Sequence, residues 1–271
     1  MGFLTEPEPP RGVATAVHSG VRRIVAGNPR PMTYWGTNTY LIDGVDGVTV
    51  LDPGPDDAAH VAAVLAAAGR VSHIVLSHTH QDHLGATAAL RAATGAPVHA
   101  WQDVAVPDFT PDFGLRHGDR VGEWTALHTP GHASDHLCFA GPDGVLLSAD
   151  HVMSWSSSVI SPPGGNMAAY FHSLRRLLER EDRFYLPGHG PKLPDPVPFV
   201  QALLDHRLAR EGAILEALGA APLGSRAITD LLYSQVDPRL RRAAERNVIA
   251  HLAKLVEEGR AQQAEAGWIH G

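Results

Sequence analysis

The sequence has little cysteine, no long apolar run and no excess of basic charge. Its single cysteine, Cys138, excludes an internal disulfide framework and a zinc site built from cysteines. No segment approaches the roughly 20 apolar residues that a membrane helix needs. The N-terminal residues show neither the basic start nor the apolar core of a signal peptide. We therefore expect a cytoplasmic protein with no membrane segment.

The shortage of basic charge bears on the class of partner. The chain carries 22 Lys and Arg against 29 Asp and Glu, which gives a net charge of −7. Residues 190–271 hold ten basic and ten acidic side chains, so this part of the chain is neutral. Strong nucleic-acid binders usually carry a basic excess on the binding domain. The charge distribution therefore counts against nucleic-acid binding as the main function.

Histidine, in contrast, is concentrated in one short stretch. Residues 77–85 read Ser-His-Thr-His-Gln-Asp-His-Leu-Gly. The apolar run before them predicts a buried strand, and the Ala-rich segment 84–94 predicts a helix that ends at Gly95. The ligand-type side chains then lie on a strand-to-helix turn, with Asp82 near the helix N-cap. Because imidazole and carboxylate are the usual ligands of zinc and similar ions, the stretch predicts a metal site.

The patterns before residue 191 predict strands alternating with helices. Two β-type runs joined by a Gly-rich turn predict a hairpin over 38–52. The other predicted strands cover 97–101, 123–128, 137–140, 145–147 and 183–186, and the other predicted helices cover 57–68 and 167–180.

After residue 191 the pattern is helical. Apolar residues at helical spacing predict helices over 198–218, 229–234 and 240–255. Prolines 191, 194, 196 and 198 indicate a boundary just before the first of these helices. We expect two domains, covering residues 1–195 and 196–271.

Four further ligand-type residues share one design, in which a β-type run ends in a turn that presents the side chain. They are Asp52, His132, Asp150 and His189, and three of them adjoin a Pro-Gly pair. Together with residues 78–83 they supply five histidines and up to three aspartates. This set is too large for one tetrahedral zinc site and suits two ions that share a bridging carboxylate. Asp135 and His136 follow a ligand closely, and we expect them to support the ligands.

In order along the chain, these residues resemble the signature of the metallo-β-lactamase-fold hydrolases. The resemblance implies an α/β fold, an αββα four-layer sandwich of two sheets packed face to face between helices. It also implies one metal ion held by His78, His80 and His132, a second held by Asp82, His83 and His189, and Asp150 as the bridge. Asp52 is implied to orient the His-rich turn without binding an ion. Zinc is the expected metal, at two ions per chain.

Departures within that family narrow the expected chemistry. Asp150 stands where a major group of true β-lactamases has cysteine, which argues against antibiotic hydrolysis. The His-rich turn also lacks the glutamate typical of the di-iron, oxygen-reducing members, so hydrolysis is favoured over redox chemistry.

A narrower resemblance covers nearly the whole chain. Residues 129–136, 148–150 and 185–191 resemble the lactamase-beta-like-two group, whose members carry a C-terminal winged-helix-like domain. Residues 228–234 and 238–258 and the tail to Ile269 would supply its two helices and wing. The animal member of the group is associated with endoribonuclease activity on single-stranded RNA.

The sequence therefore predicts a dinuclear metallo-hydrolase in which a metal-bridging hydroxide attacks a carbonyl or phosphoryl centre. Asp82 is the residue expected to assist catalysis by orienting or relaying a proton. The expected substrate is an ester, thioester, lactone or phosphodiester, carried by a small molecule or by single-stranded RNA. A glyoxalase-like thioesterase is one alternative. A nucleic-acid-binding winged-helix protein with a structural metal site is another. The oligomeric state and the substrate-binding residues stay open.

Overall fold

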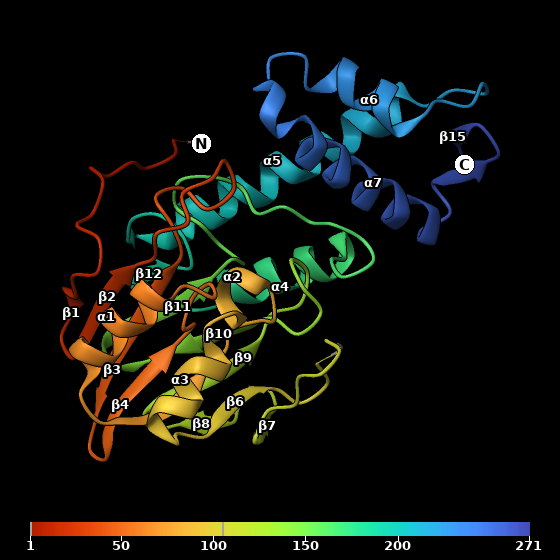
Figure 1. The fold of residues 1–271 in the computed structure, drawn as a ribbon. Helices are drawn as coiled ribbons and strands as arrows, with labels where there is room; N and C mark the ends of the chain where they lie inside the picture. The colour runs from red at the N-terminus through yellow and green to blue at the C-terminus, as the bar shows by residue number, and fades with distance from the viewer. Residues whose placement is uncertain (1, 105) are drawn as a thin grey trace.

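The computed structural model describes residues 2–104 and 106–271, and two β-sheets form its centre (Figure 1). The first sheet has seven strands in the order in which they occur along the chain. They are β1 (Thr15–His18), β2 (Val21–Val25), β3 (Asn38–Gly44), β4 (Gly47–Leu51), β5 (Val71–Val75), β6 (Val98–Trp101) and β7 (Phe113–Leu115). Strands β1 to β4 are antiparallel, and β4 to β7 are parallel.

The second sheet has six strands in the order β13-β12-β11-β10-β9-β8. These are β8 (Arg120–Val121), β9 (Trp124–His128), β10 (Leu137–Ala140), β11 (Val145–Ala149), β12 (Phe184–Pro187) and β13 (Leu193–Pro194). Only β11 and β12 pair in parallel, and the helix α4 (Met167–Leu178) connects them. The expected hairpin over 38–52 and the expected strands of this region are all present, whereas β1, β2, β7, β8 and β13 were not predicted.

Apolar side chains fill the spaces between the layers. One cluster, which includes Tyr40, Leu137 and Phe139, lies between the two sheets. A second packs the first sheet against α1 (Ala58–Ala68) and α3 (Thr87–Thr94), and a third packs the second sheet against α4 and α5 (Pro196–Ala217). Because each sheet buries both faces, the arrangement is the four-layer αββα sandwich that the sequence predicted. The fold class is confirmed.

One local prediction was wrong. The segment after the His-rich turn is not one helix over 84–94 but two, α2 (Gln81–Leu84) and α3, with a break at Gly85. Next to this break the N–H of Ala86 donates a hydrogen bond to the carbonyl of Gly54, in a different segment of the chain, over 2.9 Å. Asp82 also lies in the first turn of α2, and His80 occupies the N-cap position. Local helix propensity is therefore overridden by a contact across 32 residues.

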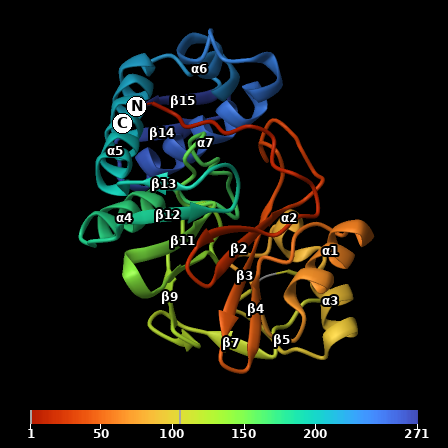
Figure 2. The same cartoon turned by 90° about the vertical axis from the view of Figure 1, so that its left-hand side faces the viewer.

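The C-terminal part of the chain forms its own small core. Helices α6 (Ser225–Leu232) and α7 (Arg241–Glu257) pack on the end of α5, with Ile214, Ile228 and Val248 fully buried. The hairpin of β14 (Ala261–Ala264) and β15 (Gly267–His270) completes the unit as the wing. Figure 2 shows these elements stacked at one end of the sandwich. The winged-helix prediction is confirmed, although α6 begins at Ser225 rather than at residue 229.

Among the helices of the described residues, none is long and apolar enough to cross a membrane. The domain limits of 1–195 and 196–271 stay a prediction, and α5 begins at Pro196.

His99 on β6, which is not among the predicted ligands, gives a testable pH dependence. Burial, helped by the neighbouring His73 and opposed by Asp112, lowers the pKa of His99 to about 4. The unfolded chain therefore takes up this proton near pH 6.5, before the folded chain does. The free energy of unfolding therefore has its full value above pH 6.5 and decreases as the pH falls towards 4.

We expect the free energy of unfolding to fall more steeply for the wild type than for His99→Gln when the pH is lowered from 7 to 4. The expected difference is about 2 kcal/mol after an allowance for partial solvent screening. Urea unfolding of both proteins at the two pH values measures it. Parallel pH profiles would contradict the assignment.

Candidate metal centre

The seven predicted ligands converge at one edge of the sandwich because they follow strand ends. The His-rich turn follows β5, His132 follows β9, Asp150 follows β11 and His189 follows β12. Their potential ligand atoms form three overlapping groups in which all atoms lie within 4.8 Å of one another. The first group is His78, His80 and His132, and the second group is Asp82, His83 and His189; a further triad of His78, His83 and Asp150 connects the two.

The first group consists of three imidazole nitrogens that face one another. The Nδ1 atom of His80 lies 3.0 Å from Nε2 of His78 and 3.0 Å from Nε2 of His132. A proton on Nδ1 of His80 can form a hydrogen bond to only one of these two neighbouring nitrogens. Separations of about 3.3 Å are also those between nitrogens bound to one tetrahedral zinc ion. The three atoms therefore have the geometry of a cation site.

The second group is mixed, and Asp150 joins it to the first. Nε2 of His189 lies 3.3 Å from Oδ2 of Asp82, and Nε2 of His83 lies 3.7 Å from the same oxygen. Oδ2 of Asp150 lies 3.4 Å from Nε2 of His189 and 3.7 Å from Nε2 of His132. One carboxylate thus contacts histidines of both groups, which is the place that a bridging ligand occupies.

The charges of the two groups differ. Burial and the neighbouring imidazoles lower the pKa of His78 well below its usual value, and the pKa of His132 falls to about 4 for the same reasons. These histidines are therefore neutral at pH 7, which is the form that binds metal.

In the second group, the carboxylates reverse the effect of burial on the histidines. Burial lowers the pKa of His189, but the charge of Asp150 together with hydrogen bonds to Asp150 and Asp82 outweighs it and raises the pKa to about 9. Burial likewise raises the pKa of Asp150, but the charges of His189 and His83 hold it well below its usual range. Without metal, protons on His83 and His189 thus balance the carboxylates, and a cation can take their place.

Buried polar atoms without partners support the same conclusion. Within residues 2–104 and 106–271, Nε2 of His83 and Oδ1 of Asp150 are buried and have no hydrogen-bond partner. Such atoms are rare in folded proteins because an unsatisfied buried polar group costs about 1–3 kcal/mol. His83 belongs to the second group and Asp150 connects that group to the first, so a bound ion would satisfy both atoms. The residues present therefore fit a metal centre.

Asp52 supports the His-rich turn from inside the sheet. It is 1% exposed and accepts hydrogen bonds from the N–H of Ser77, from the Ser77 hydroxyl and from Nδ1 of His83, over 2.7, 2.7 and 2.8 Å. The bond to Nδ1 directs Nε2 of His83 into the ligand cluster. Asp52 also has a positive φ of 52°, which aims its carboxylate at the turn.

The other two predicted supporting residues lie on the opposite side of the turn. Asp135 accepts from the N–H and the hydroxyl of Thr79, over 3.0 and 2.5 Å. His136 is fully buried, its Nδ1 lies 3.0 Å from the hydroxyl of Thr129, and its ring centroid is 5.1 Å from that of His78. Both residues contact the turn or a ligand, as expected.

Two glycines allow the backbone to come this close. A Cβ on Gly188 would lie 2.3 Å from Oδ1 of Asp150, so no larger residue fits before His189. Gly131, before His132, has a φ of 147°, and a Cβ there would lie 2.4 Å from the backbone of Tyr170. The Pro-Gly pairs seen in the sequence therefore have a steric role.

Several supporting residues were missed by the sequence analysis. The amide of Asn38 donates to the carbonyls of Pro187 and Gly190 and so fixes the turn that carries His189. Nδ1 of His132 donates to the carbonyl of Val159 over 2.7 Å. Ser77, which donates to Asp52, is the first residue of the His-rich stretch, whereas Asn38 and Val159 carry no sequence signal because they act through long-range contacts.

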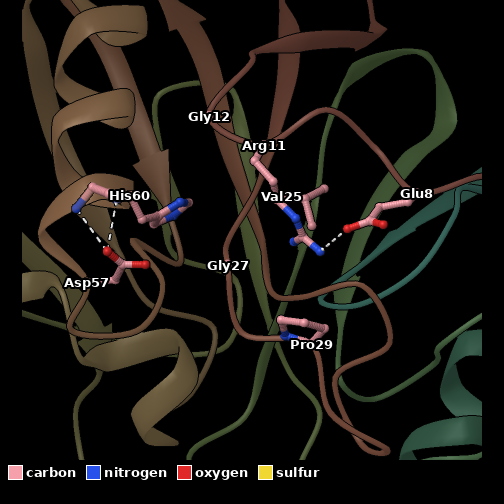
Figure 3. Close-up of a pocket in the computed structure, with 9 residues that line it drawn as sticks. Glu8, Arg11, Gly12, Val25, Gly27, Pro29, Asp57 and His60 are labelled. Carbon is pink, nitrogen blue, oxygen red and sulfur yellow. Dashed lines mark hydrogen bonds and ion pairs between the residues drawn. The ribbon is translucent and has the colours of Figure 1, made fainter.

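The cavity in Figure 3 is separate from the ligand cluster. It has a volume of 510 Å³ and is lined by residues of the N-terminal segment, β2 and α1, among them Glu8, Arg11, Asp57 and His60. Its one guanidinium, that of Arg11, is paired with Glu8 over 2.8 Å. None of the seven predicted ligands lines it, so it is not part of the candidate metal centre.

Comparison with known proteins agrees with this geometry. A family model described as the metallo-beta-lactamase superfamily matches residues 32–105 and 100–189, more than half of the chain. This chain belongs to the metallo-beta-lactamase superfamily. Membership identifies the chain as a hydrolase of that superfamily. A second model, described as the beta-lactamase-associated winged helix domain, matches residues 225–268. The resemblance drawn from the motifs is confirmed for both parts of the chain.

Individual relatives are similar to this chain over most of its length. A Drosophila melanogaster protein named beta-lactamase-like protein 2 homolog is 29% identical over 269 residues, covering 91% of each protein. A Passalora fulva protein named atrochrysone carboxyl ACP thioesterase is 29% identical over 227 residues, covering 77% of this chain and 65% of that protein. The crystal structure of a beta-lactamase domain protein from Burkholderia ambifaria superimposes with a TM-score of 0.84 at 21% identity, covering 97% and 95%. That similarity shows the shared fold.

Proposed function

We propose that this chain is a dinuclear metal-dependent hydrolase that cleaves an ester or thioester bond. The observation that carries the proposal is the position of Asp150, whose Oδ2 lies within 3.7 Å of Nε2 of both His132 and His189. The remaining ligands then divide into two sets, His78, His80 and His132 for one ion and Asp82, His83 and His189 for the other. Seven donors exceed the four of a structural zinc site, which supports a catalytic centre.

When two divalent ions are bound, they lower the pKa of a water molecule and polarise the bond to be cleaved. The protein side chains hold the ions and orient the reacting groups. Neutral His78, His80 and His132 offer nitrogen donors, and zinc suits such a donor set. Asp82 is 29% exposed at its side chain, whereas His83 and His189 are buried. Burial raises the pKa of Asp82, but the charges of His83 and His189 lower it below its usual range, so the carboxylate stays ionised and can accept a hydrogen bond from a water molecule or a substrate. Orienting or relaying a proton through that hydrogen bond is the catalytic role that we propose for Asp82.

The thioester is favoured among the possible substrates by one comparison, because the Passalora fulva relative is named as a thioesterase. A phosphodiester in single-stranded RNA is the second candidate, and the match of residues 225–268 to a winged-helix model is the observation that favours it. The neutral charge of residues 190–271 counts against it. We propose a small-molecule substrate and no membrane partner.

The proposal is tested by metal analysis together with a substrate panel. We expect protein that has been stripped with a chelator and reloaded to take up two zinc ions per chain and to hydrolyse a thioester. Manganese and iron are loaded in parallel, and lactone, β-lactam, phosphodiester and single-stranded RNA substrates complete the panel. Saturation at one ion per chain would refute the dinuclear centre. Binding of RNA by metal-free protein, with no hydrolysis of any substrate, would favour the binding function instead.

A further inference from the structure

Three consecutive residues of the loop between β11 and α4 lie against the ligands. The hydroxyl of Ser158 donates to the backbone carbonyls of Asp150 and His151, over 2.6 and 3.0 Å. The carbonyl of Val159 accepts the hydrogen bond from Nδ1 of His132. Ser158 and Ile160 are fully buried, so water does not compete for these contacts. The segment 158–160 therefore forms part of the wall behind two predicted ligands.

The opposite side of the same segment is bound by the C-terminal helices. The N–H of Ile160 donates to Oδ1 of Asn247 on α7 over 2.9 Å. The guanidinium of Arg207 on α5 donates to the carbonyl of Ser158. Figure 1 shows this loop, in green, running between the sandwich and α7. Segment 158–160 thus forms hydrogen bonds to the metal centre on one side and to the C-terminal helices on the other.

The burial of Arg207 shows that this contact is costly to build. The residue is 3% exposed, its guanidinium lies 5.6 Å from the centre of the Tyr170 ring, and no carboxylate is among the groups that act on its pKa within the described residues. A buried charge without a partner of opposite sign costs several kcal/mol unless hydrogen bonds compensate for it. Its bond to the Ser158 carbonyl supplies such compensation. A simple packing contact would not need a charged group here.

The carbonyl of Val159 cannot turn freely between these two anchors. Peptide groups are planar, so the orientation of the Val159 carbonyl is set by the peptide that it shares with the N–H of Ile160. Asn247 holds that same peptide group through the N–H. By accepting from Nδ1, the carbonyl keeps the proton of His132 on Nδ1 and leaves Nε2 free to bind an ion.

We propose that Asn247 and Arg207 are positioning residues of the metal centre, which act through segment 158–160 on the tautomer and orientation of His132. The C-terminal domain then has a role in assembling the catalytic site. This inference rests on the proposed function only in requiring that His132 binds an ion. It does not depend on the identity of the substrate or on the number of ions.

Cobalt binding to the full-length protein tests the proposal without an activity assay. In Asn247→Leu the side chain keeps its approximate size but loses the acceptor. We expect the affinity for the Co²⁺ ion bound by His132 to fall about tenfold and its visible absorption band to shift. Asn247→Asp keeps an acceptor oxygen, and we expect it to restore both values to within about twofold of the wild type.

The adjacent residue provides a matched control. Val248 is fully buried in the core of the C-terminal domain, so Val248→Ala weakens that domain, and we expect the cobalt spectrum to stay unchanged. Wild-type affinity in Asn247→Leu, an equal loss in Val248→Ala, or no recovery in Asn247→Asp would each overturn the proposal. Failure of the wild type to bind cobalt at all would instead refute the proposed metal centre.

Discussion

Asp150→Asn is expected to reduce hydrolysis by about 1000-fold, equivalent to about 4 kcal/mol of transition-state stabilisation. The substitution preserves the shape of the side chain but removes the negative charge that faces His83, His132 and His189. The bridge between the two ligand groups is lost with it. We also expect metal content to fall from two ions towards one. Turnover of the substrate found in the panel, with elemental analysis of the same samples, measures both effects.

A surface aspartate gives the control for this experiment. Asp46, exposed in the turn between β3 and β4, is expected to tolerate Asn without loss of activity or metal. Asp150→Asn that keeps more than about one tenth of the wild-type turnover would show that no bridging carboxylate is needed. A loss of activity with both ions still bound would place the effect of Asp150 in catalysis rather than in metal binding.

Replacement of Asp52 by Ala is expected to lower the free energy of unfolding of the metal-free protein by about 3–5 kcal/mol. The side chain is buried and accepts three hydrogen bonds, two from Ser77 and one from His83, and Ala would leave these donors without a partner. Because Nδ1 of His83 loses its acceptor, we also expect metal affinity to fall by about 10- to 100-fold. Guanidinium unfolding and competition with a chelator provide the two measurements.

Asp56, exposed and four residues away, supplies the comparison, and Asp56→Ala is expected to change neither quantity. Asp52→Asn should fall between the wild type and Ala in stability, since its carbonyl can still accept one or two of the bonds. If Asp52→Ala unfolds like the wild type, the His-rich turn does not depend on support from the sheet.

The candidate ligands could be found from the sequence because each lies in the turn or short helix that follows a strand, and two of them adjoin a Pro-Gly pair. His78, His80, Asp82 and His83 lie within six positions, so their convergence requires only the local turn. The strand-end pattern of His132 and His189 predicts that they lie at the same edge of the fold as this turn. The division of these ligands between two ions stays a prediction.

The supporting contacts could not be found in the same way. Asn38 and Val159 reach His189 and His132 from segments that are distant in sequence, and neither residue type indicates metal chemistry. The break at Gly85 depends on a hydrogen bond to Gly54, which helix propensity cannot predict. The strands β1 and β2 are short, and their sequences, Thr-Ala-Val-His and Val-Arg-Arg-Ile-Val, do not alternate regularly between apolar and polar residues.

The sequence by itself determined the expected chemistry: its histidines and aspartates at strand ends predict a cation-binding centre, and their resemblance to the metallo-β-lactamase signature implies an αββα hydrolase. Side-chain type and spacing are local properties, so both can be read without the tertiary structure. The tertiary structure decided which residues hold the ligands in place, from Asp52 behind His83 to Val159 beside His132. Hydrogen bonds between distant segments exist only after the two sheets and the C-terminal helices have packed, so no sequence pattern encodes them directly. The link from Asn247 to the metal centre is of this kind.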